Sequence, residues 1–219
     1  MKEGDFIRID YVGRIGESKD IFDLTREDVA KENGIYNPNF KYGPVPIIIG
    51  ANLLVKGLED GLKTMEVGEK KEIIVKPEEA FGERSPELIK LVPLSEFKRQ
   101  NITPYPGMLV TVRNINGRVL SVSGGRVRVD FNHPLAGKSL EYDMEIKGEI
   151  TDQKEKIKAI LEYFLKTDEK DLDVTINGEV VEITMKGKED VPREVKTVIT
   201  NTITKWINEI KKVRFIEEY

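Results

Sequence analysis

The side chains that most often carry out catalysis are scarce in this chain of 219 residues. His133 is the single histidine and there is no cysteine, which excludes a catalytic triad, a histidine-rich metal site, a thiolate nucleophile and Cys-ligated zinc. The segment 136–139 resembles a phosphate loop, but Asn132 replaces a glycine and Pro134 interrupts the amides. The most informative residues lie instead in three short segments that each contain an aromatic side chain, at 9–13, 80–82 and 130–138.

The first 87 residues show alternating strand and helix patterns. Residues 6–12 predict a half-buried strand, which Gly13 and Gly16 close into a turn. A helix is expected between Thr25, placed as its N-cap, and Gly34, placed as its C-terminal stop. Further expected elements are an ordered loop at 35–46, a strand at 46–50, a helix at 53–62 with Leu54, Leu58 and Leu62 aligned, and a strand at 68–75.

Residues 88–130 have an almost wholly β pattern, with strands expected at 108–112, 118–122 and 126–129. Asn116-Gly117 and Gly124-Gly125 are strong hairpin signals. The stretch carries seven Lys and Arg against two acids, although the whole chain has a net charge of -4. A solvated face is the simpler interpretation of this charge, and attraction of acidic unfolded segments or RNA is the alternative.

The composition changes after Thr151. A helix is expected from Asp152 to Thr167, followed by a hairpin around Asn177-Gly178, a long helix that begins at Val191-Pro192, and a strand at 213–216. These elements predict a separate αββαβ domain over 152–219. Because so small a sheet leaves an edge or a face uncovered, a homodimer formed through this domain is expected.

The three aromatic segments together resemble the signature segments of the FKBP-type prolyl isomerases. The resemblance covers residues 1–87 and 131–151, and it also includes Phe22-Asp23, Gly50, 55–59 and 68–70. It implies an α+β fold in which a half-open antiparallel β-sheet curves around a short helix. Residues 88–130 stand where SlyD-type members carry an inserted small β domain, the insert-in-flap chaperone domain. The predicted domains are therefore 1–87 with 131–151, 88–130 and 152–219.

By this resemblance, an apolar pocket between the sheet and the helix holds a proline ring. Matched motif by motif, its residues are Tyr11, Phe22, Asp23, Leu54, Val55, Leu58, Phe81, Leu135 and Tyr142. Taken singly, the aromatic residues among them would be assigned to the core. Leu58 stands where many members have tryptophan, and a leucine at this position resembles the SlyD branch. Phe81 stands where many members have tyrosine. The lost hydroxyl implies weaker macrolide binding, with isomerase activity retained in part.

The chemistry that the resemblance implies needs no cofactor, metal, catalytic acid or base. Rotation about an X-Pro bond is opposed by amide resonance, with a barrier of ~18–20 kcal/mol. An apolar cavity disfavours the planar, dipolar amide more than the twisted one. By family analogy, the N–H of Val55 holds a substrate carbonyl. Asp23 is then a local partner of Tyr11 or of a strained carbonyl, and it is not a general base.

The resemblance also implies that the inserted domain captures unfolded chains. The residues expected to be exposed for this purpose are drawn from Met108, Leu109, Val110, Leu120 and Val122. An equally supported alternative is that the same side chains fill the small interior of a 43-residue unit.

The predicted function is a cytoplasmic FKBP-type peptidyl-prolyl cis-trans isomerase and folding chaperone, whose partners are unfolded or nascent polypeptides that contain proline. The alternative is a holdase with a vestigial isomerase pocket, which Phe81 favours. Nucleic acid is not expected as a partner, because the basic insert lacks the interleaved exposed aromatics of single-strand binders. No membrane association is expected either, because no apolar run approaches the ~20 residues of a spanning helix.

Overall fold

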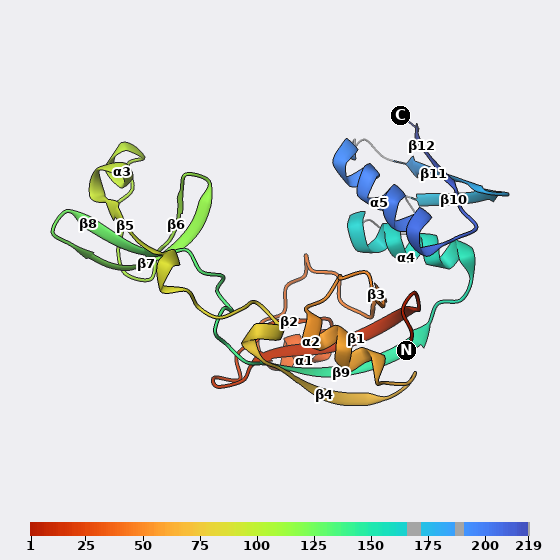
Figure 1. Ribbon diagram of the computed structural model, residues 1–219, viewed down its shortest axis with the longest axis horizontal. Helices are drawn as coiled ribbons and strands as arrows, with labels where there is room; N and C mark the ends of the chain where they lie inside the picture. Colours follow the sequence, from red (N-terminus) through yellow and green to blue (C-terminus); the bar gives the residue numbers. More distant parts are fainter. Residues whose placement is uncertain (166–171, 187–190, 219) are drawn as a thin grey trace. The chain divides into compact units, whose positions relative to one another are not determined.

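The computed structural model describes residues 1–165, 172–186 and 191–218, and the chain forms two compact units (Figure 1). The first unit comprises Met1–Ile74 and Glu141–Tyr219, and the second comprises Val75–Leu140. Residues 166 and 167, with which the first C-terminal helix was expected to end, lie outside the described residues. Within the described ranges, no helix is long and apolar enough to cross a membrane.

The first unit is built on a five-stranded sheet in the order β2-β1-β9-β4, with β3 also paired to β1. Its strands are β1 (Phe6–Ile15), β2 (Ile21–Leu24), β3 (Val45–Ile48), β4 (Lys70–Val75) and β9 (Leu140–Glu149). The long strand β1 pairs with β3 through its first half, from Phe6 opposite Ile48 to Ile9 opposite Val45. Its second half pairs with β2, where Val12 lies opposite Leu24. The predicted turn does follow β1, at residues 16–18 and so at Gly16, but Gly13 lies inside the strand.

Helix α1 (Glu27–Glu32) ends as predicted, but it does not begin as predicted. Gly34 has a φ of 68°, its N–H bonds to the Lys31 carbonyl, and the next N–H bonds to the Ala30 carbonyl. These two bonds form the Schellman arrangement that glycine favours. The N-cap is Arg26 and makes no side-chain cap. Thr25 fails as a cap because its buried hydroxyl is bonded to strand β1.

Helix α2 (Lys56–Lys63) begins three residues later than the sequence predicts. Leu58 and Leu62 are buried on one helical face as expected, whereas Leu54 precedes the helix and does not share that face. A Cβ on Gly61 would lie 2.6 Å from the Ile73 side chain. The glycine therefore permits close packing of α2 on β4.

The C-terminal part of the first unit has the predicted αββαβ order. Its elements are α4 (Gln153–Leu165), β10 (Leu172–Asn177), β11 (Val180–Lys186), α5 (Arg193–Trp206) and β12 (Lys212–Glu218). The sheet has the order β10-β11-β12, and β12 runs parallel to β11. Phe6 and Ile48 of the first sheet belong to the same buried cluster as Ile160 of α4 and Ile203 of α5. The C-terminal domain therefore shares a core with strands β1 and β3.

The second unit contains a four-stranded sheet in the order β5-β8-β7-β6. Its elements are two 3₁₀ turns, η1 (Pro77–Glu79) and η2 (Pro86–Leu88), strands β5 (Ile89–Pro93), β6 (Leu109–Val112), β7 (Ile115–Ser123) and β8 (Arg126–Asp130), and helix α3 (Leu94–Arg99). Neither β5 nor α3 was predicted. Phe97 on α3 is buried among the valines of the sheet, so tertiary packing stabilises this short helix.

One of the two predicted hairpin turns in this unit is wrong. Gly124-Gly125 does join β7 to β8, with positive φ at both residues. Asn116-Gly117 lies inside β7, and the turn between β6 and β7 is formed by Arg113 and Asn114, which have φ of 51° and 64°. A Cβ on Gly117 would lie 2.7 Å from Val129 and 2.8 Å from Phe131. This glycine provides space for packing and does not form the turn.

Candidate functional site

Three aromatic side chains of the first unit form a contiguous cluster. Tyr142 of β9 meets Phe22 of β2 edge to face, with ring centroids 5.6 Å apart and an interplanar angle of 87°. Tyr11 of β1 lies on the other side, 6.2 Å from Tyr142 at 62°. Edge-to-face pairs of this kind fix ring orientation. The sheet therefore brings together three residues of which the first, Tyr11, and the last, Tyr142, are 131 positions apart in the sequence.

Gly13 makes this cluster possible. It lies opposite Asp23 in the β1–β2 pair, and the register shifts immediately after it. A Cβ at this position would approach Phe22 Cζ to 2.8 Å and Tyr142 Cε1 to 3.1 Å. The rings of Phe22 and Tyr142 therefore occupy the space that the Cβ of any other residue at position 13 would need. The sequence indicated a glycine of structural importance here, but assigned it to a turn.

A short hydrogen-bond network orients Tyr11. Its hydroxyl donates to Oδ2 of Asp23 at 2.7 Å, and Oδ1 of Asp23 accepts the N–H of Leu24 at 2.9 Å. The backbone of Tyr11 is held by Thr25, whose Oγ1 accepts the Tyr11 N–H at 2.9 Å and donates to Asp10 at 2.8 Å. Asp23 thus has the tyrosine partner that the sequence analysis named as one of two options. Both of its carboxylate oxygens are occupied by local donors.

The tyrosine hydroxyls of the cluster stay protonated at neutral pH. Burial, followed by the charge of Asp23, raises the pKa of Tyr142 to about 12. Burial is also the main cause that raises the pKa of Tyr11, and the Asp23 carboxylate adds to the shift. A low-polarity setting and a nearby negative charge both disfavour a phenolate. The site therefore offers apolar ring faces and neutral hydroxyl groups.

The loop before α2 carries the predicted donor, Val55. Val55 is the N-cap of α2, and its carbonyl accepts the N–H groups of Leu58 and Glu59. No acceptor for the Val55 N–H itself is present among the residues that the structure describes. The buried carboxylate of Glu59 accepts the Gly50 N–H and so anchors the start of the loop. Leu54 is partly buried beside Val55, and Leu58 is buried on the helix.

Phe81 and Leu135 belong to the second unit. The Phe81 ring stacks on His133 with centroids 4.1 Å apart and an interplanar angle of 7°. Nδ1 of His133 accepts the N–H of Leu135 at 3.2 Å, so the histidine stabilises the loop around Pro134. The carbonyl of Gly82 accepts the N–H of Gly137 at 2.8 Å. The motifs 80–82 and 133–137, which are distant in sequence, are therefore joined.

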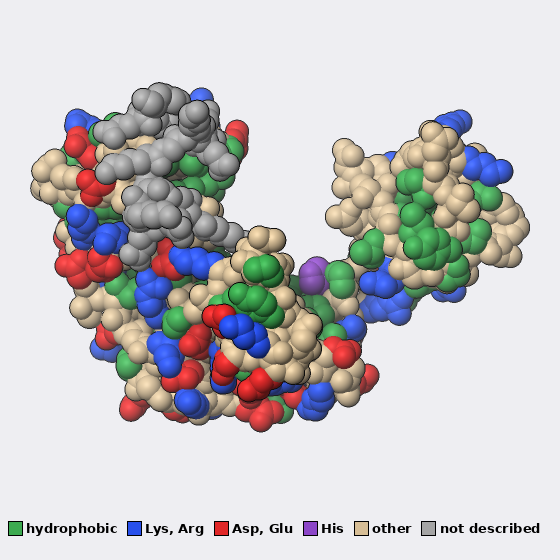
Figure 2. Space-filling view, turned by 180° about the vertical axis from the view of Figure 1, so that it is seen from behind, with side chains coloured by type: hydrophobic (Ala, Val, Ile, Leu, Met, Phe, Trp, Pro, Cys, Tyr) green, Lys and Arg blue, Asp and Glu red, His purple; other side chains and the backbone are tan. Residues whose placement is uncertain are grey.

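The five residues proposed to bind unfolded chains divide between the interior and the surface of the insert. Val110 is 5% exposed and belongs to its core, which is the alternative that the sequence left open for each of these residues. Met108 packs partly against this core and Leu120 is half-buried. Leu109 and Val122 are exposed, together with residues that the sequence analysis did not name, namely Leu91, Tyr105 and Ile115. Hydrophobic side chains are visible on the surface of this unit (Figure 2).

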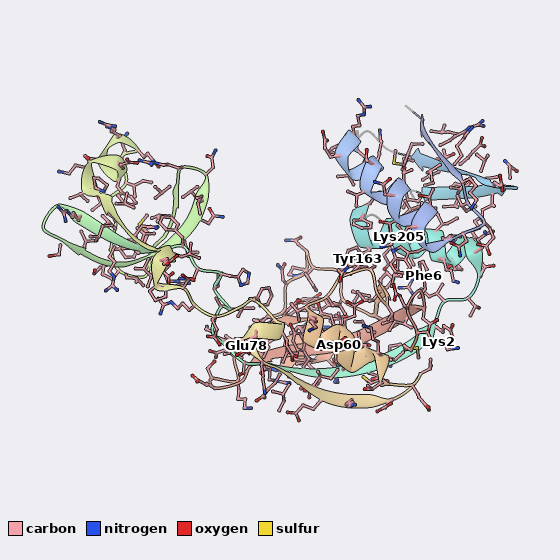
Figure 3. All side chains as sticks on the ribbon, viewed as in Figure 1. Lys2, Phe6, Asp60, Glu78, Tyr163 and Lys205 are labelled. Atoms are coloured by element: carbon pink, nitrogen blue, oxygen red, sulfur yellow. The ribbon has the colours of Figure 1, made fainter. Side chains whose placement is uncertain are left out.

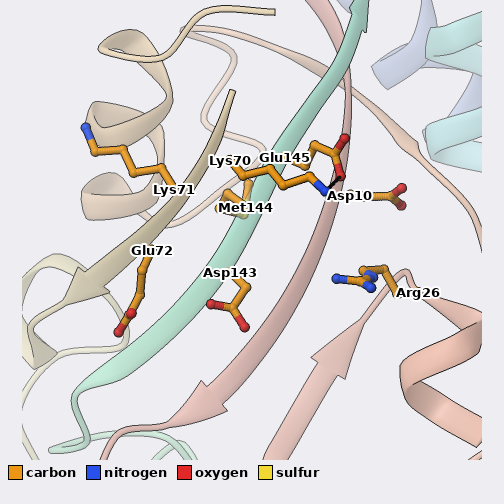
Figure 4. Close-up of a pocket in the computed structure, with 8 residues that line it drawn as sticks. All are labelled: Asp10, Arg26, Lys70, Lys71, Glu72, Asp143, Met144 and Glu145. Carbon is orange, nitrogen blue, oxygen red and sulfur yellow. Dashed lines mark ion pairs between the residues drawn. The ribbon is translucent and has the colours of Figure 1, made fainter. Parts of the chain in front are cut away.

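A separate hollow of about 290 Å³ lies on the sheet of the first unit (Figure 4). It is lined by charged side chains of both signs, including an ion pair between Lys70 and Glu145 at 3.6 Å. Asp143 and Glu145 alternate with Tyr142 along β9, so they point to the opposite face of the sheet. A charged lining on that face does not suit a proline ring.

Three matches to known families together cover most of the chain. Residues 1–96 match FKBP-type peptidyl-prolyl cis-trans isomerase, residues 90–135 match the FKBP26 IF domain, and residues 153–219 match the FKBP26 C-terminal domain.

Individual relatives agree with these matches. The chain is 35% identical over 147 residues to the short-type peptidyl-prolyl cis-trans isomerase of Methanocaldococcus jannaschii, which covers 67% of this chain and 92% of the relative. It is 34% identical over 119 residues to the FKBP-type isomerase SlyD of Helicobacter pylori, with 52% and 63% covered. The aromatic cluster, the free N–H before α2 and these matches agree, and the chain belongs to the FKBP-type peptidyl-prolyl cis-trans isomerases.

Proposed function

We propose that this protein isomerises X-Pro bonds of unfolded polypeptides at the cluster of Tyr11, Phe22 and Tyr142, with the Val55 N–H as the donor to a substrate carbonyl. The observation that carries this proposal is the edge-to-face packing of the three rings around Gly13, which creates an apolar wall on the sheet. Leu54 and Leu58 of the same unit belong to the proposed pocket, and Phe81 and Leu135 stay predictions that rest on the family resemblance.

The proposed mechanism is stabilisation of a twisted amide. Planar X-Pro bonds carry a large dipole through resonance, and the twisted transition state loses part of it. Apolar ring faces solvate the less polar, twisted form better than the planar one. Each ~1.4 kcal/mol of this difference in free energy increases the rate about tenfold. Asp23 orients Tyr11 through the 2.7 Å hydrogen bond and transfers no proton.

Two substitutions test this assignment in a peptide isomerisation assay. Tyr142→Ala removes the central ring of the cluster, and Asp23→Ala releases the Tyr11 hydroxyl. Both variants are expected to isomerise a proline tetrapeptide more slowly than the wild type. Unchanged rates in both would contradict the proposed site.

We further propose that the insert holds unfolded chains through its exposed apolar side chains. The strand pair β6–β7 supports this, because Leu109 is 69% exposed and Ile115 is 58% exposed, while Val110 and Val112 fill the interior. Exposed apolar side chains of this kind are available to bind an apolar segment of another chain. By tethering a client, the insert would raise the local concentration of its prolines.

Ile115 has a matched control outside the insert. Ile74 on β4 is also an exposed isoleucine, at 63%. Ile115→Ser is expected to weaken suppression of client aggregation, while Ile74→Ser leaves it intact, and neither changes isomerisation of a short peptide. Equal effects of the two substitutions on aggregation would contradict a specific surface on the insert.

The domain boundaries, the oligomeric state and the location are also proposals. We place the boundaries at 1–87 with 131–151, at 88–130 and at 152–219. We propose a homodimer through the last domain, supported by a three-stranded sheet whose edge strands are β10 and β12. A monomeric mass by light scattering at micromolar concentration would contradict the dimer. A cytoplasmic location agrees with the absence of cysteine, and cell fractionation would test it.

A further inference from the structure

Helix α4 of the C-terminal domain packs on strand β3 and on the segment that leads into α2. Tyr163 and Phe164 of α4 border a gap of only about 10 Å³. Phe6, strand β3 and Leu53 close this gap on the other side. Figure 3 labels Tyr163 and Phe6 among these side chains. The helix is thus closely packed against the isomerase domain.

Tyr163 joins this helix to the loop before α2 by a hydrogen bond. Its hydroxyl donates to the carbonyl oxygen of Leu53 at 3.3 Å. Leu53 is two residues before Val55, whose N–H lacks an acceptor in the described part of the chain. Burial raises the pKa of Tyr163, so the hydroxyl remains a donor at neutral pH. The loop is therefore held at its start by Glu59 and in its middle by Tyr163.

The preceding residue of α4 fixes the helix to the isomerase domain. Glu162 pairs with Arg8 of β1 at 2.8 Å and with Lys41 at 3.4 Å. Arg8 also donates to the carbonyl oxygen of Pro44 at 3.2 Å. The side chain of Glu162 is only 16% exposed, so solvent screens this network less than a fully exposed pair. These contacts of Glu162 hold α4, and with it Tyr163, in place beside the loop.

Tyr163 also lies within electrostatic reach of the aromatic cluster. Burial and Asp23 are the main causes that raise the pKa of Tyr11, and Tyr142 and Tyr163 act in the same direction. Tyr163 was not predicted as a site residue, because the helical pattern reports burial within the C-terminal domain and Tyr163 contacts the isomerase domain.

We propose that Tyr163 is a positioning residue of the isomerase site, whose hydroxyl holds the Leu53 carbonyl and thereby sets the direction of the Val55 N–H. Preorganised donors accelerate reactions because their orientation is fixed before the substrate binds. The C-terminal domain then contributes to catalysis as well as to any self-association. This inference rests on the proposed function of the Val55 N–H.

The test compares three full-length proteins: the wild type, Tyr163→Phe and Thr202→Val. Thr202 is a matched control, because its hydroxyl also donates to a backbone carbonyl, that of Val198 in α5, but has no contact with the loop. We would measure kcat/KM for a proline tetrapeptide, the thermal midpoint, and the amide resonance of Val55. The resonance reports loop geometry, which a purely structural role of Tyr163 would leave unchanged.

Tyr163→Phe is expected to lower kcat/KM by about two- to tenfold, the range of one net hydrogen bond, and to shift the Val55 resonance. Thr202→Val should do neither. A Tyr163→Phe protein with wild-type kcat/KM and an unshifted Val55 resonance would overturn the inference, as would an equal loss of activity in Thr202→Val. An inactive wild type would instead refute the proposed function itself, so the two failures are distinguishable.

Discussion

Replacing Gly13 with alanine adds a single methyl group at the point where the two strands on either side of β1, β2 and β9, bring Phe22 and Tyr142 together. The new Cβ would lie 2.8 Å from Phe22 and 3.1 Å from Tyr142, inside the 3.4 Å at which ordinary contact begins. Overpacking of this kind costs about 1–3 kcal/mol. Because Phe22 is only half-buried, its ring can turn away, so most of the cost should appear in the geometry of the site.

A displaced ring is expected to lower the catalytic rate more than the stability. If the whole of ~1–3 kcal/mol appears in the transition state, kcat/KM for a proline tetrapeptide falls by about 5- to 160-fold. The thermal midpoint should change little. Near-UV circular dichroism would report the altered tyrosine and phenylalanine packing.

Gly148 is the matched control for this experiment. It lies in β9, the strand that carries Tyr142, and a Cβ at this position would meet no atom within 4 Å. Gly148→Ala should therefore retain wild-type activity. If Gly13→Ala isomerises the peptide as fast as Gly148→Ala, the rings are not the catalytic surface and the reasoning is refuted.

Three further outcomes follow from named contacts. Asp23→Asn should lower the pKa of Tyr142 from about 12, because a negative charge is removed, and absorbance of tyrosinate on titration checks this. In the wild type, the free energy of unfolding should fall as pH rises from ~10 toward 12. The cause is that Tyr142 has an ordinary tyrosine pKa in the unfolded state and therefore loses its proton there first. A free energy of unfolding that does not change over this pH range in denaturant titrations would contradict this prediction. Gly117→Ala should destabilise the insert by about 1–3 kcal/mol, because its Cβ would lie 2.7 Å from Val129, and should reduce aggregation suppression while peptide isomerisation persists.

Features set by local backbone geometry could be predicted from the sequence. Gly34 ends α1 and Gly124-Gly125 forms the turn before β8, because both places need positive φ and glycine adopts it without strain. The αββαβ order of the C-terminal domain was also predicted, since periodicity distinguishes its long helices from its strands.

Features set by close tertiary approach could not be predicted. Gly13 and Gly117 were assigned to turns, but each provides space for a side chain from another strand, and a single sequence does not distinguish these two uses of glycine. Thr25 was predicted as an N-cap, and its hydroxyl instead bonds to Tyr11 and Asp10 of β1. Which partner a buried hydroxyl takes depends on the neighbouring strand.

The pocket residues were named through family resemblance, and the structure brings four of them into one network, namely Tyr11, Phe22, Asp23 and Tyr142. Tyr163 was not foreseen, because its hydrogen bond joins residues 110 positions apart across two domains. Such a contact leaves no pattern in the local sequence.

Refolding of a client limited by one cis-proline tests the central claim most directly, with full-length protein added in catalytic amounts. An apolar, aromatic isomerase site predicts that the slow refolding phase accelerates in proportion to the protein added, and that Gly13→Ala accelerates it less. Suppressed aggregation with an unchanged slow phase would contradict the claim and would instead identify a chaperone that binds chains without isomerising them.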